Sequence, residues 1–162
     1  SSPHLAAELF AARAGIEIVH VPYKGTGAAI NDFLGGQVKA YFDTMQSMPY
    51  VKEGKIKALA VTTEKRLANA PDLPTVEESG VASGVISSSW FGFFTQEQVP
   101  QARRTEISDA LLKIAGDPAA QEKMRAFDLV PVQVGARDFG QFLEAESKRW
   151  GGLIKAQNIT VE

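Results

Sequence analysis

Apolar side chains recur along the chain with two spacings, one typical of helices and one typical of buried strands. Segments with the two spacings alternate. A helix is expected to begin with Ser2 as N-cap and Pro3 at the first helical position, and to end at Gly15. A β-branched run at residues 16–21, ended by Pro22, predicts a strand buried on both faces. Similar patterns predict helices at residues 29–34, 45–54, 76–79, 100–114, 118–127 and 138–157, and strands at residues 38–42, 56–61, 89–95 and 130–134.

Strands that alternate with helices of this length indicate an α/β domain with a largely parallel sheet. In open sheets of this kind, ligands bind beyond the carboxyl ends of the strands, where the following helices begin. Residues 1–4, 23–27 and 43–47 occupy those positions. We therefore expect three polar segments to converge at one edge of the sheet.

Composition narrows the classes of protein that the chain can represent. With 162 residues, of which 44% are hydrophobic and 22% charged, it can bury one good core, which argues against a disordered, collagen-like or membrane-spanning chain. Lys and Arg number 17 against 19 Asp and Glu, with no basic block, so a nucleic-acid partner is not expected. The absence of cysteine excludes a disulfide scaffold, a cysteine nucleophile and a thiolate metal site.

The first polar segment is the start of the first predicted helix, with Ser1, Ser2 and His4. Free backbone N–H groups and the positive end of the helix dipole favour an anion at such a place. The alternative interpretation is that Ser-Pro simply starts a helix.

The second polar segment contains Tyr23, Lys24 and Gly25, followed by Thr26 and Gly27. It offers a phenol, an ammonium group and a turn whose backbone can approach a ligand. It is not a phosphate-binding loop, because Lys precedes the glycines, and it lacks the third glycine of a dinucleotide fingerprint. A glycine turn with a solvated lysine is the alternative.

The third segment is the end of a predicted strand, where Asp43 stands. An acid at this place either caps the next helix or accepts a hydrogen bond from a ligand amine or hydroxyl. His4 and Asp43 could also form an acid/base pair with a serine nucleophile, but no Gly-x-Ser-x-Gly motif surrounds Ser1 or Ser2. His20 lies within a predicted strand and is expected to be a core or sheet residue, so no metal site is expected.

Several short motifs resemble one known family, and they occur in order along nearly the whole chain. They are SSPHL at residues 1–5, HVPYKG at 20–25, GGQV at 35–38, FD at 42–43, GKI at 54–56, ALAVT at 58–62, PDLPTV at 71–76 and WFG at 90–92, with Pro100 and the closing Arg149-Trp150. This combination resembles the Bug (Bordetella uptake gene) or TctC family, the periplasmic solute-binding receptors of tripartite tricarboxylate transporters.

The resemblance implies a two-lobed, type II Venus-flytrap fold that closes on a small carboxylate such as a dicarboxylate or tricarboxylate, an amino acid or an aromatic acid. It implies no cofactor and no catalysis, a periplasmic location and membrane transporter subunits as partners. By the family layout, residues 1–92 would form the second ligand-binding lobe. Residues 93–162 would form a crossover strand and C-terminal helices that pack on a first lobe lying upstream of this chain.

The family's ligand-binding segments correspond to the three polar segments described above. The resemblance implies ligand contacts from Ser1, Ser2, His4, Tyr23, Lys24, Gly25 and Asp43. The helix start would bind a carboxylate, and Asp43 would face the more variable end of the ligand. Without the first lobe, we expect weak or absent ligand binding and an exposed apolar surface that favours a homodimer or a swap of elements.

Two alternatives remain open from the sequence. One is the effector-binding domain of a transcriptional regulator, which uses a similar two-lobed fold. The other is an α/β enzyme with His4 and Asp43 as acid and base.

Overall fold

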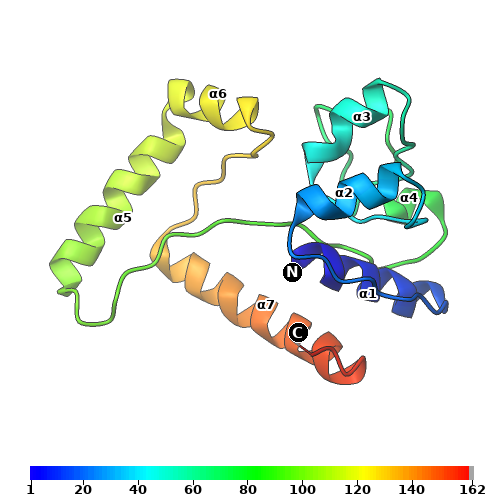
Figure 1. The fold of residues 1–162 in the computed structure, drawn as a ribbon. Helices are drawn as coiled ribbons and strands as arrows, with labels where there is room; N and C mark the ends of the chain where they lie inside the picture. Colours follow the sequence, from blue (N-terminus) through cyan, green and yellow to red (C-terminus); the bar gives the residue numbers. More distant parts are fainter. Residues whose placement is uncertain (161–162) are drawn as a thin grey trace. The chain divides into compact units, whose positions relative to one another are not determined.

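The computed structural model describes residues 1–160 and divides the chain into two compact units. The first unit is Ser1–Trp90, and the second begins at Phe91. Its elements are α1 (Ser2–Ala14), α2 (Thr26–Leu34), the short 3-10 helix η1 (Met45–Ser47), α3 (Met48–Lys52) and α4 (Val76–Ser79). The second unit contains α5 (Gln101–Gly116), α6 (Pro118–Ala126) and α7 (Ala136–Ala156). Figure 1 shows these helices along the chain.

The helices confirm the predictions made from apolar spacing, with small shifts at their ends. Ser2 lies inside α1 and Ser1 takes the N-cap position without a side-chain cap, so the prediction of Ser2 as N-cap was wrong. The physical reason is that the Ser2 hydroxyl pairs with Ser89 instead of a backbone N–H group. At the other end, Gly15 adopts a left-handed conformation with φ 65°, as expected of a helix C-cap.

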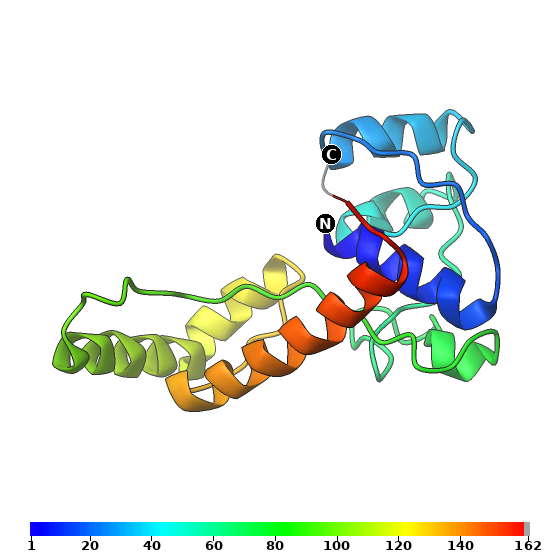
Figure 2. The same ribbon diagram turned by 90° about the horizontal axis from the view of Figure 1, so that it is seen from below.

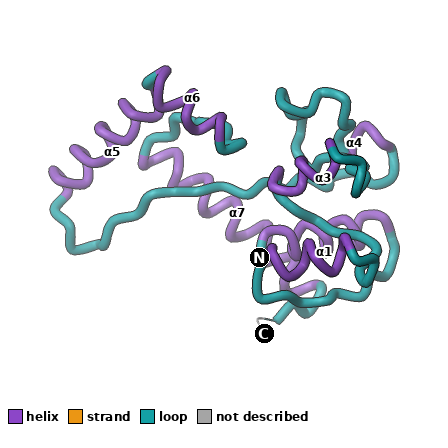
Figure 3. Tube along the Cα trace, turned by 45° about the horizontal axis from the view of Figure 1, so that its top comes forward, coloured by secondary structure: helices purple, strands orange, loops and turns teal. Residues whose placement is uncertain are grey.

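Among residues 1–160 no parallel sheet is seen, in contrast to the prediction from apolar spacing. The five predicted strand segments run as loops in Figure 3, and an isolated parallel bridge joins Val61 to Thr75. β-Branched patterns favour an extended backbone, but a sheet also requires neighbouring strands in register and apolar cover. Val19 is 92% exposed and Leu59 is 73% exposed, so these segments lack the cover that the pattern had indicated.

The core of the first unit lies between its helices and the segment that follows residue 70. Buried apolar side chains come from α1, α2 and that later segment, and they are Ala6, Leu9, Ala11, Ala29, Ile30, Ala70, Val76, Ala82 and Val85. Because α1 and α2 each place buried residues in this core, both helices are anchored by one face and leave their first turns at the surface.

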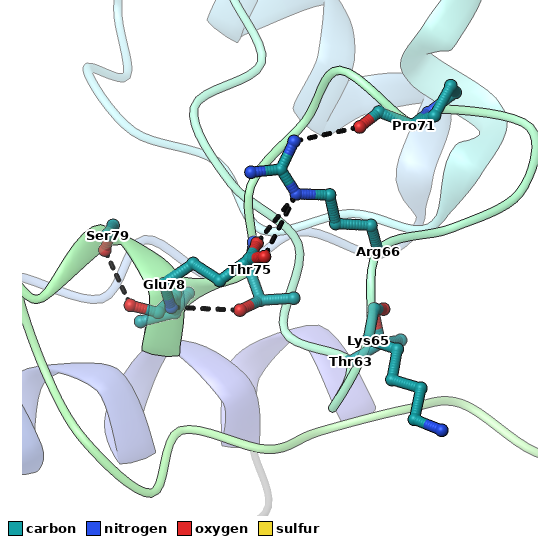
Figure 4. A network of polar contacts seen from close by, with 8 residues as sticks. Thr63, Lys65, Arg66, Pro71, Thr75, Glu78 and Ser79 are labelled. Carbon is teal, nitrogen blue, oxygen red and sulfur yellow. Dashed lines mark hydrogen bonds and ion pairs between the residues drawn. The ribbon is translucent and has the colours of Figure 1, made fainter.

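A polar network fixes the short helix α4 and the loop before it. Thr75 and Glu78 form a capping box, in which the Thr75 hydroxyl accepts from the Glu78 N–H at 3.0 Å and Glu78 accepts from the Thr75 N–H at 2.8 Å. Arg66 donates to the same carboxylate at 2.9 Å and to the carbonyl oxygen of Pro71 at 3.1 Å (Figure 4). The network therefore connects residues 66–79 without a sheet.

In the second unit, one capping residue joins two of the helices. Asp117 ends α5 and caps α6, accepting from the Ala120 N–H at 2.8 Å. On α7, the Phe139 ring contacts Phe94 at 5.4 Å and Phe142 at 6.2 Å between centroids. Among residues 1–160, none of the helices combines the length and apolarity that crossing a membrane requires.

Candidate functional site

The helices α1 and α2 begin on the same side of the first unit and run in the same general direction (Figures 1 and 2). The segment between them, residues 15–25, returns the chain from the end of α1 to the side on which α1 began. The His4 and His20 rings join this segment to the first turn of α1, stacked with centroids 3.7 Å apart and 9° between planes. Two of the three predicted polar segments thus lie on one side of the unit.

His20 differs from its prediction as a core or sheet residue. It is exposed and lies in an extended loop, because the predicted strand around it does not form. His4 is half-buried, and its Nε2 lies 3.3 Å from Glu8 Oε1, one helical turn along α1. The stacking on His4 is therefore what positions the His20 ring.

The start of α1 offers backbone donors with no side-chain cap. Ser1 makes no capping hydrogen bond, and the first turn holds no acidic residue that would oppose an anion. Ser1 and Ser2 are exposed, and the Oγ atoms of Ser2 and Ser89 lie 2.8 Å apart. Sequence reasoning did not find Ser89, and the run of serines at 87–89 before Trp90 was the signal that could have found it.

The start of α2 is similar, with Gly25 as N-cap and no side-chain cap. Lys24 and Gly25 are both exposed. The Tyr23 hydroxyl donates to Asp32 Oδ2 at 2.8 Å, and this hydrogen bond raises the pKa of Tyr23. The phenol thus faces α2 itself, whereas the ammonium group of Lys24 is solvated.

Asp43 is half-buried and accepts from two hydroxyl groups. Tyr41 donates to Oδ1 at 3.4 Å, and Ser47 donates to Oδ2. Thr44, and not Asp43, is the N-cap of η1, and it makes no side-chain capping bond. Asp43 contacts Ser47 through the Ser47 hydroxyl and does not cap the helix. The ring of Tyr41 lies 5.7 Å from the ring of Phe33 in α2, which connects Asp43 to that helix.

The contacts of these residues do not assemble an acid/base or metal site. Ser2 contacts Ser89, His4 contacts Glu8 and His20, and Asp43 accepts from Tyr41 and Ser47. These contacts do not join Ser2, His4 and Asp43 to one another, as a Ser-His-Asp triad would require. Within the described part of the chain, no three His, Asp or Glu side chains form a group that could hold a metal ion. What the arrangement offers is two uncapped helix starts, one ammonium group and one carboxylate.

Comparison with known proteins assigns the chain to a family. The family described as "Tripartite tricarboxylate transporter family receptor" (TctC) matches residues 1–159, and the chain belongs to it. This family comprises periplasmic solute-binding receptors that are not enzymes. Membership favours the receptor interpretation over the regulator and the acid/base enzyme.

Curated relatives cover nearly all of this chain. The "UPF0065 protein in gbd 5'region" of Cupriavidus necator is 31% identical over 152 residues, which is 94% of this chain and 46% of the relative. "Protein BugT" of Bordetella pertussis is 31% identical over 160 residues, or 96% of this chain and 48% of the relative. The chain therefore spans about half the length of the curated relatives it matches.

Solved structures show that the fold is part of a periplasmic binding protein. An R. palustris protein solved with adipate is 33% identical and superposes with a TM-score of 0.85, covering 99% of this chain and 54% of that one. The periplasmic binding protein BugD is 28% identical, with a TM-score of 0.80 over 100% of this chain and 55% of its own. MatC from Rhodopseudomonas palustris with bound malate is 26% identical, with a TM-score of 0.77 over 95% and 53%.

Proposed function

We propose that this chain supplies one wall of a cleft that binds a small carboxylate in a periplasmic receptor of a tripartite tricarboxylate transporter. The observation that carries the proposal is the uncapped start of α1, exposed and free of acidic residues in its first turn. The family assignment supports it, since similar proteins have been solved with adipate and with malate.

Each predicted ligand residue has a role in the proposal that suits its chemistry. Ser1, Ser2 and His4 bind a carboxylate at the start of α1, and Lys24 and Gly25 add a positive charge and a close backbone approach at the start of α2. Tyr23 contributes the face of its ring, because its hydroxyl is engaged with Asp32. Asp43 accepts from a hydroxyl or amine at the other end of the ligand.

The wider arrangement is part of the same proposal. Residues 1–92 act as the second lobe of the receptor, and residues 93–162 supply the crossover segment and the helices that pack on the first lobe. The closed receptor then delivers its ligand to the membrane subunits of the transporter. A single wall offers about half of the polar partners, so the isolated chain binds weakly, with a Kd on the order of 1 mM, within reach of titration.

Titration of the 162-residue chain with adipate and with malate, followed by backbone NMR, tests the proposal. We expect saturable shifts at Ser1 to Leu5, and Ser2→Ala should weaken binding about two- to tenfold because one hydrogen bond to a charged group is lost. Ser88→Ala is the matched control in the serine run and should leave the Kd unchanged. Saturable shifts that avoid the start of α1, or no shifts at all, would overturn the proposal.

A further inference from the structure

Two contacts of the Tyr41 side chain bear on the placement of Asp43. Its hydroxyl donates to Asp43 Oδ1 at 3.4 Å. Its ring lies 5.7 Å from the ring of Phe33, at an angle of 39°. Phe33 belongs to α2, so Tyr41 connects Asp43 to that helix.

The protonation state of Tyr41 suits a donor. Burial, followed by the charge of Asp43, raises the pKa of Tyr41 above its ordinary value of 10.0. The phenol therefore keeps its proton at neutral pH. The direction of the hydrogen bond is fixed as a result, with Tyr41 donating to Asp43.

The remaining acceptor capacity of Asp43 determines what it can recognise. Each carboxylate oxygen has two acceptor positions, and Tyr41 uses one on Oδ1 while Ser47 uses one on Oδ2. One position on each oxygen is left, and both have an orientation set by the protein. A ligand hydroxyl or ammonium group can donate there, whereas a second ligand carboxylate placed at the same point is repelled.

We propose that Tyr41 is a positioning residue for ligand selectivity, which holds Asp43 so that the site prefers carboxylates bearing a hydroxyl or amino group over plain dicarboxylates. This inference rests on the proposed function. Tyr41 does not contact the ligand itself. It acts through Asp43, and so its loss should change the preference between two ligands more than the affinity for both.

Malate and succinate provide the test, because they differ by one hydroxyl on the same four-carbon dicarboxylate. We expect the wild-type chain to bind malate more tightly, and Y41F to weaken malate binding about two- to tenfold while succinate binding stays within about twofold. Y41F keeps the ring against Phe33, so we expect the variant to fold. Its melting temperature, compared with that of the wild type, checks this. Tyr50→Phe, which removes another phenol from the same unit, should leave the malate-to-succinate ratio unchanged.

The possible outcomes distinguish a failure of the Tyr41 role from a failure of the proposed function. Equal wild-type affinity for the two ligands, or an equal change for both in Y41F, overturns the role of Tyr41 and leaves the proposed function standing. A wild-type chain that binds neither ligand overturns the proposed function and the selectivity role together.

Discussion

At the scale of single residues, Thr75 combines several structural roles. It is 2% exposed, forms the parallel bridge with Val61 and caps α4 through its hydroxyl. A capping hydroxyl contributes stability because it satisfies a backbone donor that the helix cannot. At this position it does so beside the core, with Val76 as its buried neighbour.

The capping partner Glu78 makes the stability of the first unit depend on pH. The N–H of Thr75 and then the Arg66 guanidinium hold the pKa of Glu78 below its ordinary value of 4.5. A lowered folded-state pKa stabilises the fold above pH 4.5, and this contribution is lost as the pH falls through the folded-state value. Glu78→Gln should therefore flatten the acid limb of the unfolding free energy, measured by urea titration between neutral and acidic pH.

Arg66→Ala is the companion variant for this prediction. It removes the guanidinium beside Glu78 and leaves the hydrogen bond from the Thr75 N–H to Glu78 in place. We expect it to flatten the acid limb less than Glu78→Gln does. An acid limb of the same slope in wild type and in Glu78→Gln would show that other groups are responsible.

At the scale of elements, the segment before α5 packs on α7 at a glycine. A Cβ built on Gly92 would lie 2.3 Å from Phe139 Cζ and 3.0 Å from its Cε1. Phe94 and Phe142 flank that ring, so it cannot move without disturbing an aromatic row. Gly92 therefore permits a close approach that no larger residue allows at this point.

Gly92→Ala should destabilise the second unit by about 1–3 kcal/mol, as overpacking of a formed contact does. Gly140→Ala is the matched control on α7. A Cβ there meets nothing within 4 Å, and the exchange should stabilise the helix by up to about 1 kcal/mol. Circular dichroism during thermal unfolding of both variants checks this prediction, and equal melting temperatures would contradict it.

Helices were predictable from the sequence because their signals are local. Gly15 ends α1, Asp117-Pro118 divides α5 from α6, and residues 76–79 form the single turn that was expected. The predicted strands did not pair, because pairing depends on distant segments and on cover that apolar spacing does not report. The exposure of Val19 and Leu59 is the clearest sign of that missing cover.

The candidate site, like the fold, was predictable from the sequence only in part. Sequence position placed Ser2, Gly25 and Asp43 at element starts and ends, and the uncapped starts of α1 and α2 agree with that placement. The contact of Ser2 with Ser89 was missed, since it joins residues 87 positions apart in the chain. Whether the seven predicted residues bind a ligand stays a prediction.

At the scale of the whole molecule, apolar side chains are exposed in both units. Phe91 is 85% exposed, Phe93 is 76% exposed and Val130 is 74% exposed. Soluble monomers rarely expose large contiguous apolar patches. The second unit, in addition, has no fully buried side chain among its described residues.

We therefore predict that the chain self-associates at micromolar concentration, measured by light scattering on a size-exclusion column. Combined Phe91→Ser and Phe93→Ser should shift the mass toward that of a monomer, because less apolar surface is then removed from water on association. Thr95→Ser, in the same exposed segment, should have no effect. A monodisperse monomer in the wild type would contradict this prediction.

The hydrogen bond between Ser2 and Ser89 has a topological consequence. It joins residues separated by 87 positions, so the two ends of the first unit meet at one place on its surface. A unit with adjacent ends can be carried as an insertion, since a host chain can leave and re-enter at the same point without being stretched. The first unit is thus suited to serve as a module set into a loop of a larger fold, with the start of α1 beside the junction.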